Sequence, residues 1–128
     1  MPMERSHIWL GQFQSEKALE AYFEESYHDS DLEQEAPMNR FAADQGVDFY
    51  DHDWLEYSFS NTGNLSTLIT EHSYADDYIT HVAEFAKANG LTNINTFIMV
   101  DYAEVPEPKS CIKLDYTLWF VGTFECTI

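Results

Sequence analysis

Carboxylates crowd one segment of this chain, and aromatic side chains are threaded between them. From Glu20 to Glu56 there are twelve acidic residues and a single basic one, Arg40. Seven aromatic residues lie in the same segment. Like charge at this density opposes a compact state unless something positive meets it. Aromatic residues among charged ones are also typical of binding surfaces. The segment therefore indicates a function beyond solubility.

Two short loops place histidine beside carboxylates, and both could in principle hold a cation. Residues 27–31 read YHDSD, and residues 48–53 read DFYDHD. Hard cations need several oxygen ligands from a shaped loop. Neither loop has the EF-hand spacing, and the chain has no HxxxH or HExxH pattern. We expect solvated acidic loops and no metal site, with weak, non-selective cation binding left open.

Acid–base catalysis needs two carboxyl groups in a cleft that drives their pKa values apart. With 23 acidic residues some pair must lie close in space, but the sequence does not show a cleft. The chain has no GxSxG motif, phosphate loop or glycine-rich dinucleotide turn. No local motif supports Cys111 with His72 or His81 as nucleophile and base. We expect no catalytic residue and no cofactor; a small carboxylate-based, metal-assisted enzyme remains an alternative.

The formal net charge of −17 narrows the classes of partner. Nucleic acids and anionic membranes bind cationic patches, so neither is expected as a partner. No apolar run approaches the roughly 20 residues of a membrane span, and the start of the chain lacks a secretory signal. We expect a cytoplasmic protein that attracts basic partners.

Recognition of a basic protein surface fits these observations. Phe23, Phe41 and Phe49 are expected in the core, whereas Tyr27, Tyr50 and Trp54 suit either the core or an aromatic binding spot. The acidic loops and these three aromatics make up the predicted binding residues. They are Tyr27, Asp29, Asp31, Glu33, Glu35, Asp48, Tyr50, Asp51, Asp53 and Trp54.

Hydrophobic periodicity predicts the elements that position these residues. Helices are expected from Ser15 to about Glu25, at Met38–Asp44, after Asn64, and from Ser73 to just before Gly90. Strands are expected at 7–13, 54–59, 94–102 and 112–124, the last two as an antiparallel hairpin. In the second strand Leu55, Tyr57 and Phe59 share one face, and Trp54, Glu56 and Ser58 share the other. The order predicts one α+β domain over residues 1–128, with a mostly antiparallel sheet of about four strands and helices packed on it.

The two cysteines, Cys111 and Cys126, fall near the two ends of one expected strand. A straight strand of this length keeps them tens of ångströms apart, at about 3.3 Å per residue. A disulfide needs Cα atoms within about 7 Å. We therefore expect two free thiols.

Several stretches resemble the Imm22 family of immunity proteins. The opening HIWLGQFQSEKALEAYFEESY is similar to the start of that family, and an acidic loop follows it. The segment 41–56, FAADQGVDFYDHDWLE, the Ser73-Tyr74 helix start and the terminal WFVGTF of residues 119–124 also fit. The resemblance spans nearly the whole chain and rests on motifs that are mostly structural, so it suggests no catalytic residues.

The resemblance implies an antitoxin role in bacterial polymorphic toxin systems and in competition between bacteria. Such a protein is expected to bind and neutralise a cognate toxin domain. Nuclease toxins hold polyanions in basic clefts, so a chain of this charge suggests a basic nuclease as the target. A general acidic adaptor, or DNA mimic, that binds many basic proteins is a further alternative.

Overall fold

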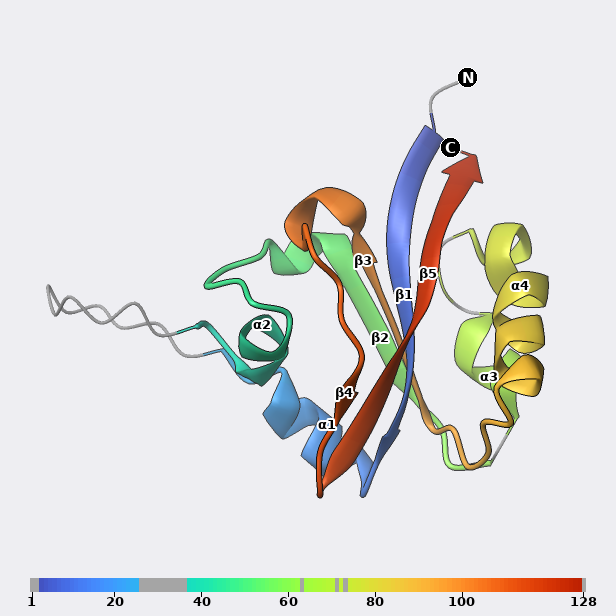
Figure 1. Ribbon diagram of the computed structural model, residues 1–128, viewed down its shortest axis with the longest axis horizontal. Coiled ribbons are helices and arrows are strands. Elements are labelled where there is room, and N and C mark those ends of the chain that lie inside the picture. The colour runs from blue at the N-terminus through green and yellow to red at the C-terminus, as the bar shows by residue number, and fades with distance from the viewer. Residues whose placement is uncertain (1–2, 26–36, 63, 71, 73, 128) are drawn as a thin grey trace, which may run out of the picture.

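The fold is a single antiparallel sheet with helices on both faces. The computed structural model describes residues 3–25, 37–62, 64–70, 72 and 74–127. Helices α1 and α2 lie on one side of the sheet and α3 and α4 on the other (Figure 1). The elements are β1 (Met3–Phe13), α1 (Glu16–Tyr22), α2 (Arg40–Asp44), η1 (His52–Trp54), β2 (Leu55–Phe59), α3 (Leu65–Ile69), α4 (Ala75–Ala88), β3 (Thr96–Asp101), η2 (Tyr102–Glu104), β4 (Cys111–Ile112) and β5 (Tyr116–Thr127).

Strand β1 is buried on both faces because the sheet separates two hydrophobic cores. Successive side chains of a strand point to opposite faces. Trp9 and Phe13 enter the core beneath α1 and α2, and Ile8 and Leu10 enter the core beneath α3 and α4. The same two-sided burial explains the unbroken apolar run in β3, which is buried from Thr96 to Val100.

The α+β class and the antiparallel sheet are confirmed, but the sheet has five strands in the order β2-β3-β1-β5-β4. The stretch expected as one strand, 112–124, is a hairpin. The Lys113 N–H donates to the Tyr116 carbonyl and closes the turn between β4 and β5. Leu114 sits fully exposed at that turn. Its alternation with Ile112 imitates a strand pattern, which is why the prediction missed the turn.

The predicted hairpin between β3 and the last strand is wrong. Strand β1 lies between them, paired antiparallel with β3 on one side and with β5 on the other. The physical reason is the two-sided burial of β1, which favours an interior position with a partner at each edge. A register shift between Ile8 and Trp9 marks a bulge in β5 next to Gly122. Within the described residues, no helix is long and apolar enough to cross a membrane.

The helix signals were read correctly in most places. Ser15 Oγ caps α1 by accepting from the Ala18 N–H, although the helix ends at Tyr22 and not near Glu25. Asn64 caps α3 as expected. Helix α4 starts at Ala75, with Tyr74 as its N-cap residue in the left-handed conformation and no side-chain cap. The predicted cap, Ser73, lies outside the described residues. Both cysteines are free thiols, as predicted, and they lie on different strands.

One carboxylate ties the α1–α2 side of the molecule together. Asp44, the last residue of α2, accepts hydrogen bonds at Oδ2 from the hydroxyls of Tyr22 (2.8 Å) and Tyr116 (2.5 Å). Burial, together with the Asp44 carboxylate, raises the pKa of both phenols, so both remain proton donors. This link joins α1, α2 and β5, and so fixes the start of the loop that leads to Trp54.

Replacing the shared acceptor should therefore destabilise the protein. We expect Asp44→Ala to lower the free energy of unfolding by about 2–4 kcal/mol, because each buried hydroxyl left without a partner costs roughly 1–3 kcal/mol. Urea unfolding measures this. Asp48→Ala, an exposed residue of the same charge, is the matched control and should change stability by about 0.5 kcal/mol or less. Equal effects of the two variants would contradict the role of Asp44.

His7 is a buried histidine whose two ring nitrogens are both engaged. Nδ1 lies 2.8 Å from Thr123 Oγ1, and Nε2 lies 2.9 Å from the Val105 carbonyl oxygen. Burial lowers the pKa of His7 because the charged ring would lose its hydration. The exposed His52 behaves in the opposite way: its hydrogen bond to Glu25 raises its pKa.

These pKa shifts predict that the two imidazole rings titrate on opposite sides of the usual histidine pKa in an NMR experiment. His7 should titrate below about 6.5 and His52 above it, 6.5 being the usual histidine value. By linkage, the contribution of His7 to stability is present above about pH 6.5 and is lost as the pH falls towards its lowered pKa. His7→Gln and His52→Gln variants assign the signals. A His7 ring that titrates at or above 6.5 would show that burial does not control it.

Candidate functional site

The predicted binding residues fall in two segments, of which one is described. Five of them, Tyr27, Asp29, Asp31, Glu33 and Glu35, lie outside the described residues. The other five belong to the connection from α2 to β2. They are Asp48, Tyr50, Asp51, Asp53 and Trp54.

Tyr50 does not face solvent, so it leaves the set of candidate contact residues. Its side chain is 1% exposed, and its hydroxyl accepts a hydrogen bond of 2.8 Å from Asn39 Nδ2. Its ring meets Phe41 edge to face at 5.5 Å. The neighbouring Phe49, expected in the core, is instead 63% exposed. Neighbouring residues of an extended segment point to opposite sides, so burying Tyr50 turns Phe49 outward.

A short network of acidic side chains shapes the turn before β2. Asp51 Oδ1 accepts from the Asp53 N–H at 3.0 Å and caps η1. Glu104 Oε1 accepts from the Asp51 N–H at 2.6 Å and ties the turn to η2. His52 Nδ1 lies 3.0 Å from Glu25 Oε2, at the end of the α1 segment. These bonds hold Trp54, which is 53% exposed, at the start of β2.

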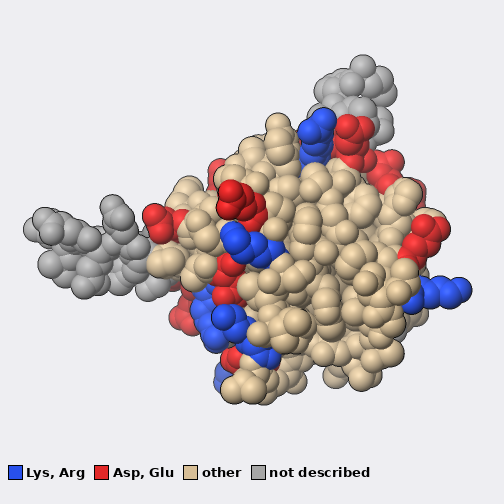
Figure 2. All heavy atoms as spheres, viewed as in Figure 1, with Lys and Arg blue, Asp and Glu red and all other residues tan. Residues whose placement is uncertain are grey.

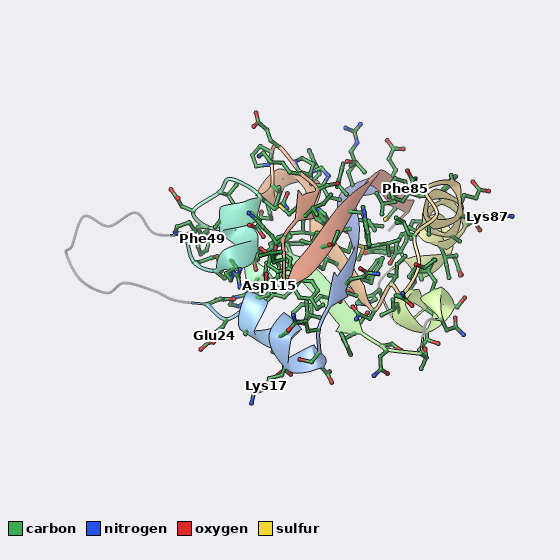
Figure 3. All side chains as sticks on the ribbon, turned by 60° about the horizontal axis from the view of Figure 1, so that its bottom comes forward. Lys17, Glu24, Phe49, Phe85, Lys87 and Asp115 are labelled. Atoms are coloured by element: carbon green, nitrogen blue, oxygen red, sulfur yellow. The ribbon has the colours of Figure 1, made fainter. Side chains whose placement is uncertain are left out.

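Asp53 and Trp54 open into a concave site at the end of the sheet, whereas Asp48 and Phe49 do not line it. We call this site the acidic hollow, and its volume is about 210 Å³. It is lined by Glu4, Ser6, Asp53, Trp54, Glu56, Tyr74, Met99 and Asp101. Figure 3 shows Phe49 beside α2, on the side of the molecule away from the labelled residues of α4.

The register of the sheet explains why these residues meet. Ser6 pairs with Asp101, and Met99 pairs with Glu56, so β1, β2 and β3 direct these side chains to the same face. That face also carries α3 and α4, which cover its apolar part. Tyr74, just before α4, lines the hollow. The hollow is therefore the part of this face where the polar ends of the strands continue beyond the covered core.

Glu56 is held in place by a chain of side chains. His72 Nδ1 lies 2.9 Å from Glu56 Oε1, and His72 Nε2 lies 2.9 Å from Ser58 Oγ. The His72 ring packs on Phe97 with ring centroids 4.7 Å apart. Its side chain is only 9% exposed. Rotation of the imidazole is thereby restricted, which fixes the carboxylate that lines the hollow.

Glu56, His72 and Ser58 are linked in the order of a hydrolytic triad, but the Ser58 hydroxyl proton is directed at a backbone carbonyl and not at His72. Ser58 Oγ donates to the Leu68 carbonyl oxygen at 2.8 Å. A serine nucleophile must instead give its proton to the histidine. The arrangement is suited to orienting Glu56. Among the described ranges, no group of three or more His, Cys, Asp or Glu side chains has the geometry to hold a metal ion.

Charge is distributed unevenly around the site. The hollow has four carboxylates and no Lys or Arg among its lining residues. In the view of Figure 2, most Lys and Arg side chains gather over β4 and the neighbouring α1–α2 region. There Arg40 Nη1 pairs with Asp115 Oδ2 at 3.5 Å and its guanidinium lies over the Tyr116 ring. The hollow is thus suited to a positively charged group.

Reasoning from sequence missed five of the residues that line the hollow with polar or aromatic groups: Glu4, Ser6, Glu56, Tyr74 and Asp101. Glu56 carried a usable signal, because its shared face with Trp54 was predicted. Glu4 and Asp101 lie on strands far apart in the sequence, and only the pairing of β1 with β3 brings them near. The left-handed Tyr74 had no detectable signal in the sequence.

A family model described as Immunity protein 22 matches residues 6–126. The chain belongs to the Immunity protein 22 family. No curated protein and no solved structure matches it. Membership in Immunity protein 22 supports a toxin-neutralising role and a non-enzymatic mode of action, and it implies a toxin as the partner.

The different positions of Tyr50 and Trp54 lead to a stability prediction. Tyr50→Ala should lower the free energy of unfolding by about 3–5 kcal/mol, as expected for a large buried aromatic residue. Trp54→Ala should change it by about 0.5 kcal/mol or less, because the indole is half exposed. Urea unfolding of both variants measures the difference. A large loss in Trp54→Ala would mean that the indole belongs to the core.

Proposed function

We propose that this protein neutralises a bacterial toxin domain by binding it non-covalently through its acidic residues, and that the toxin is a basic nuclease. The observation that carries the proposal is the acidic hollow with its exposed Trp54, in a family of immunity proteins. A charged aromatic surface of this kind combines electrostatic steering with an anchor residue.

The nuclease target is supported by charge. A nuclease must bind a polyanion, so its active cleft carries Lys and Arg. A partner of net charge −17 meets such a cleft with favourable long-range attraction. The complex would block the cleft directly or hold an adjacent basic surface, and both modes depend on the same complementarity. The protein would act in the cytoplasm, where an incoming nuclease meets its substrate.

The proposed contact residues follow from exposure. Asp53 and Trp54 line the hollow, and Asp48 and Phe49 are exposed on the α2 side of the same connection. Asp51 is partly buried and supports the turn. The acidic loop with Tyr27, Asp29, Asp31, Glu33 and Glu35 remains part of the proposed surface. Tyr50 acts only by supporting this surface from below.

Binding to the cognate toxin domain, to be sought in the gene next to that of this protein, would test the proposal. The variant Asp48→Lys/Asp53→Lys/Trp54→Ala should weaken binding by about 100-fold or more, equivalent to about 2.7 kcal/mol. The loss has two causes: two attractions become repulsions, and the anchor is removed. Calorimetry or surface plasmon resonance gives the Kd, and residual nuclease activity gives the degree of neutralisation.

The matched control is Glu84→Lys/Glu107→Lys/Ile112→Ala, which makes the same change of charge and truncates one exposed apolar residue elsewhere. It should leave the Kd within about threefold. Unchanged affinity of the first variant would exclude the acidic residues as the interface. An unrelated basic ribonuclease should not be inhibited; inhibition of it would favour a general acidic adaptor.

A further inference from the structure

The volume of the acidic hollow limits the size of the ligand that it can bind. Its volume of about 210 Å³ lies below the roughly 300–1,000 Å³ of pockets for small-molecule ligands. The hollow is open to solvent, and the Trp54 and Tyr74 side chains that line it are 53% and 37% exposed. A single side chain presented by another protein fits such a site better than a free substrate does.

The walls of the hollow are aromatic, and this observation is independent of its charge. Of the large apolar side chains that the structure leaves exposed, Trp54 and Tyr74 both line the hollow. They come from different elements, the end of η1 and the residue before α4. Aromatic faces attract cations through their quadrupole, and tryptophan does so most strongly.

Two of the four carboxylates around these walls are held by neighbouring groups. Asp101 Oδ2 accepts from the Ala103 N–H at 3.1 Å, and Glu56 Oε1 is bonded to His72. Asp53 lies at the rim, with its side chain 80% exposed and 3.5 Å from His52 Nε2. Glu4 completes the set from β1. The acceptors therefore come from four separate elements and face one small volume.

Two aromatic rings and four carboxylates, two of them fixed by hydrogen bonds, favour guanidinium over ammonium. A guanidinium is planar, stacks on aromatic rings and donates a fork of hydrogen bonds to carboxylates. An ammonium is a compact, strongly hydrated charge that gains little from flat walls. Resting on the proposed function, we infer that the acidic hollow is a receptor for one arginine side chain of the toxin, stacked on Trp54 and Tyr74 and bonded to the surrounding carboxylates.

The experiment uses the full chain and a defined probe, the Nα-acetyl amide of arginine, with the lysine counterpart as comparison. Titrations are followed by ¹H–¹⁵N NMR. Arginine should cause saturable shifts at Trp54, Tyr74 and Asp101, with a Kd in the millimolar range, near 1 mM for about −4 kcal/mol. The lysine compound should bind roughly three- to tenfold more weakly, because stacking differs by about 1 kcal/mol.

Two variants separate the walls from the carboxylates. Trp54→Ala and Glu4→Gln/Asp53→Asn should each weaken arginine binding by about tenfold or more. The control Glu84→Gln/Glu107→Gln removes the same charge from exposed positions outside the hollow and should leave binding unchanged. Chemical shifts of the core confirm that each variant is folded.

Three results would overturn the inference: no saturable shift, equal binding of arginine and lysine, or equal weakening in the control. None of them bears on whether the protein binds its toxin. If the toxin complex forms through the acidic residues while arginine does not bind the hollow, the inference fails and the proposed function stands. If arginine binds but the acidic variants bind the toxin as tightly as the unaltered protein does, the proposed interface fails.

Discussion

The pairing of β1 between β3 and β5 is the interaction on which the other features depend. It divides the molecule into two cores, because alternate residues of β1 face α1 and α2 on one side and α3 and α4 on the other. The same pairing sets Ser6 opposite Asp101 and brings the N-terminal part of β1 to the end of β3. Without this register Glu4, Glu56 and Asp101 would not share a surface. The fold and the hollow thus follow from one set of backbone hydrogen bonds.

Excess negative charge opposes this compact arrangement, and the structure limits the opposition in two ways. The half-buried acceptor Asp44 is compensated by two phenol donors, and the exposed acids stay hydrated. Most of the few cations lie away from the hollow, over β4 and its surroundings in Figure 2. The acidic hollow therefore has no Lys or Arg among its lining residues to neutralise its carboxylates. A positive partner would relieve that repulsion, so the charge that opposes the folded state of the free protein would stabilise a complex with such a partner.

Much of the fold could be predicted from sequence wherever the signal is local. The cap at Ser15, the two-sided burial of β3, and the faces of residues 55–59 all follow from spacing and side-chain type. The strand partners could not be predicted, because the apolar pattern of β1 shows that it is buried but not which strands lie beside it. The turn at Leu114 was missed because its apolar alternation continues that of a strand.

The candidate site was predicted in part for the same reasons. The excess of acid and the family resemblance were visible in the sequence, whereas the sequence left open whether Trp54 lies in the core or on a binding surface. Whether Phe49 or Tyr50 points inward depends on which ring packs beside Phe41 in the core. Tertiary packing decides this, and the local sequence does not. The hollow itself assembles residues from strands that are far apart in the sequence. Composition could therefore indicate a partner of opposite charge, but only the sheet register locates where an individual side chain of that partner would fit.

Amide hydrogen exchange in the free protein and in the complex with its cognate toxin domain locates the interface without any substitution. If the acidic hollow and the connection that leads to it bind the toxin, amide protection should increase from Asp48 to Glu56 and around Tyr74 and Asp101. The exposed face of α4 and the β4–β5 turn should exchange as they do in the free protein. Protection confined to α4 or to the β4–β5 turn, with exchange around the acidic hollow unchanged, would contradict this account of how the protein recognises its toxin.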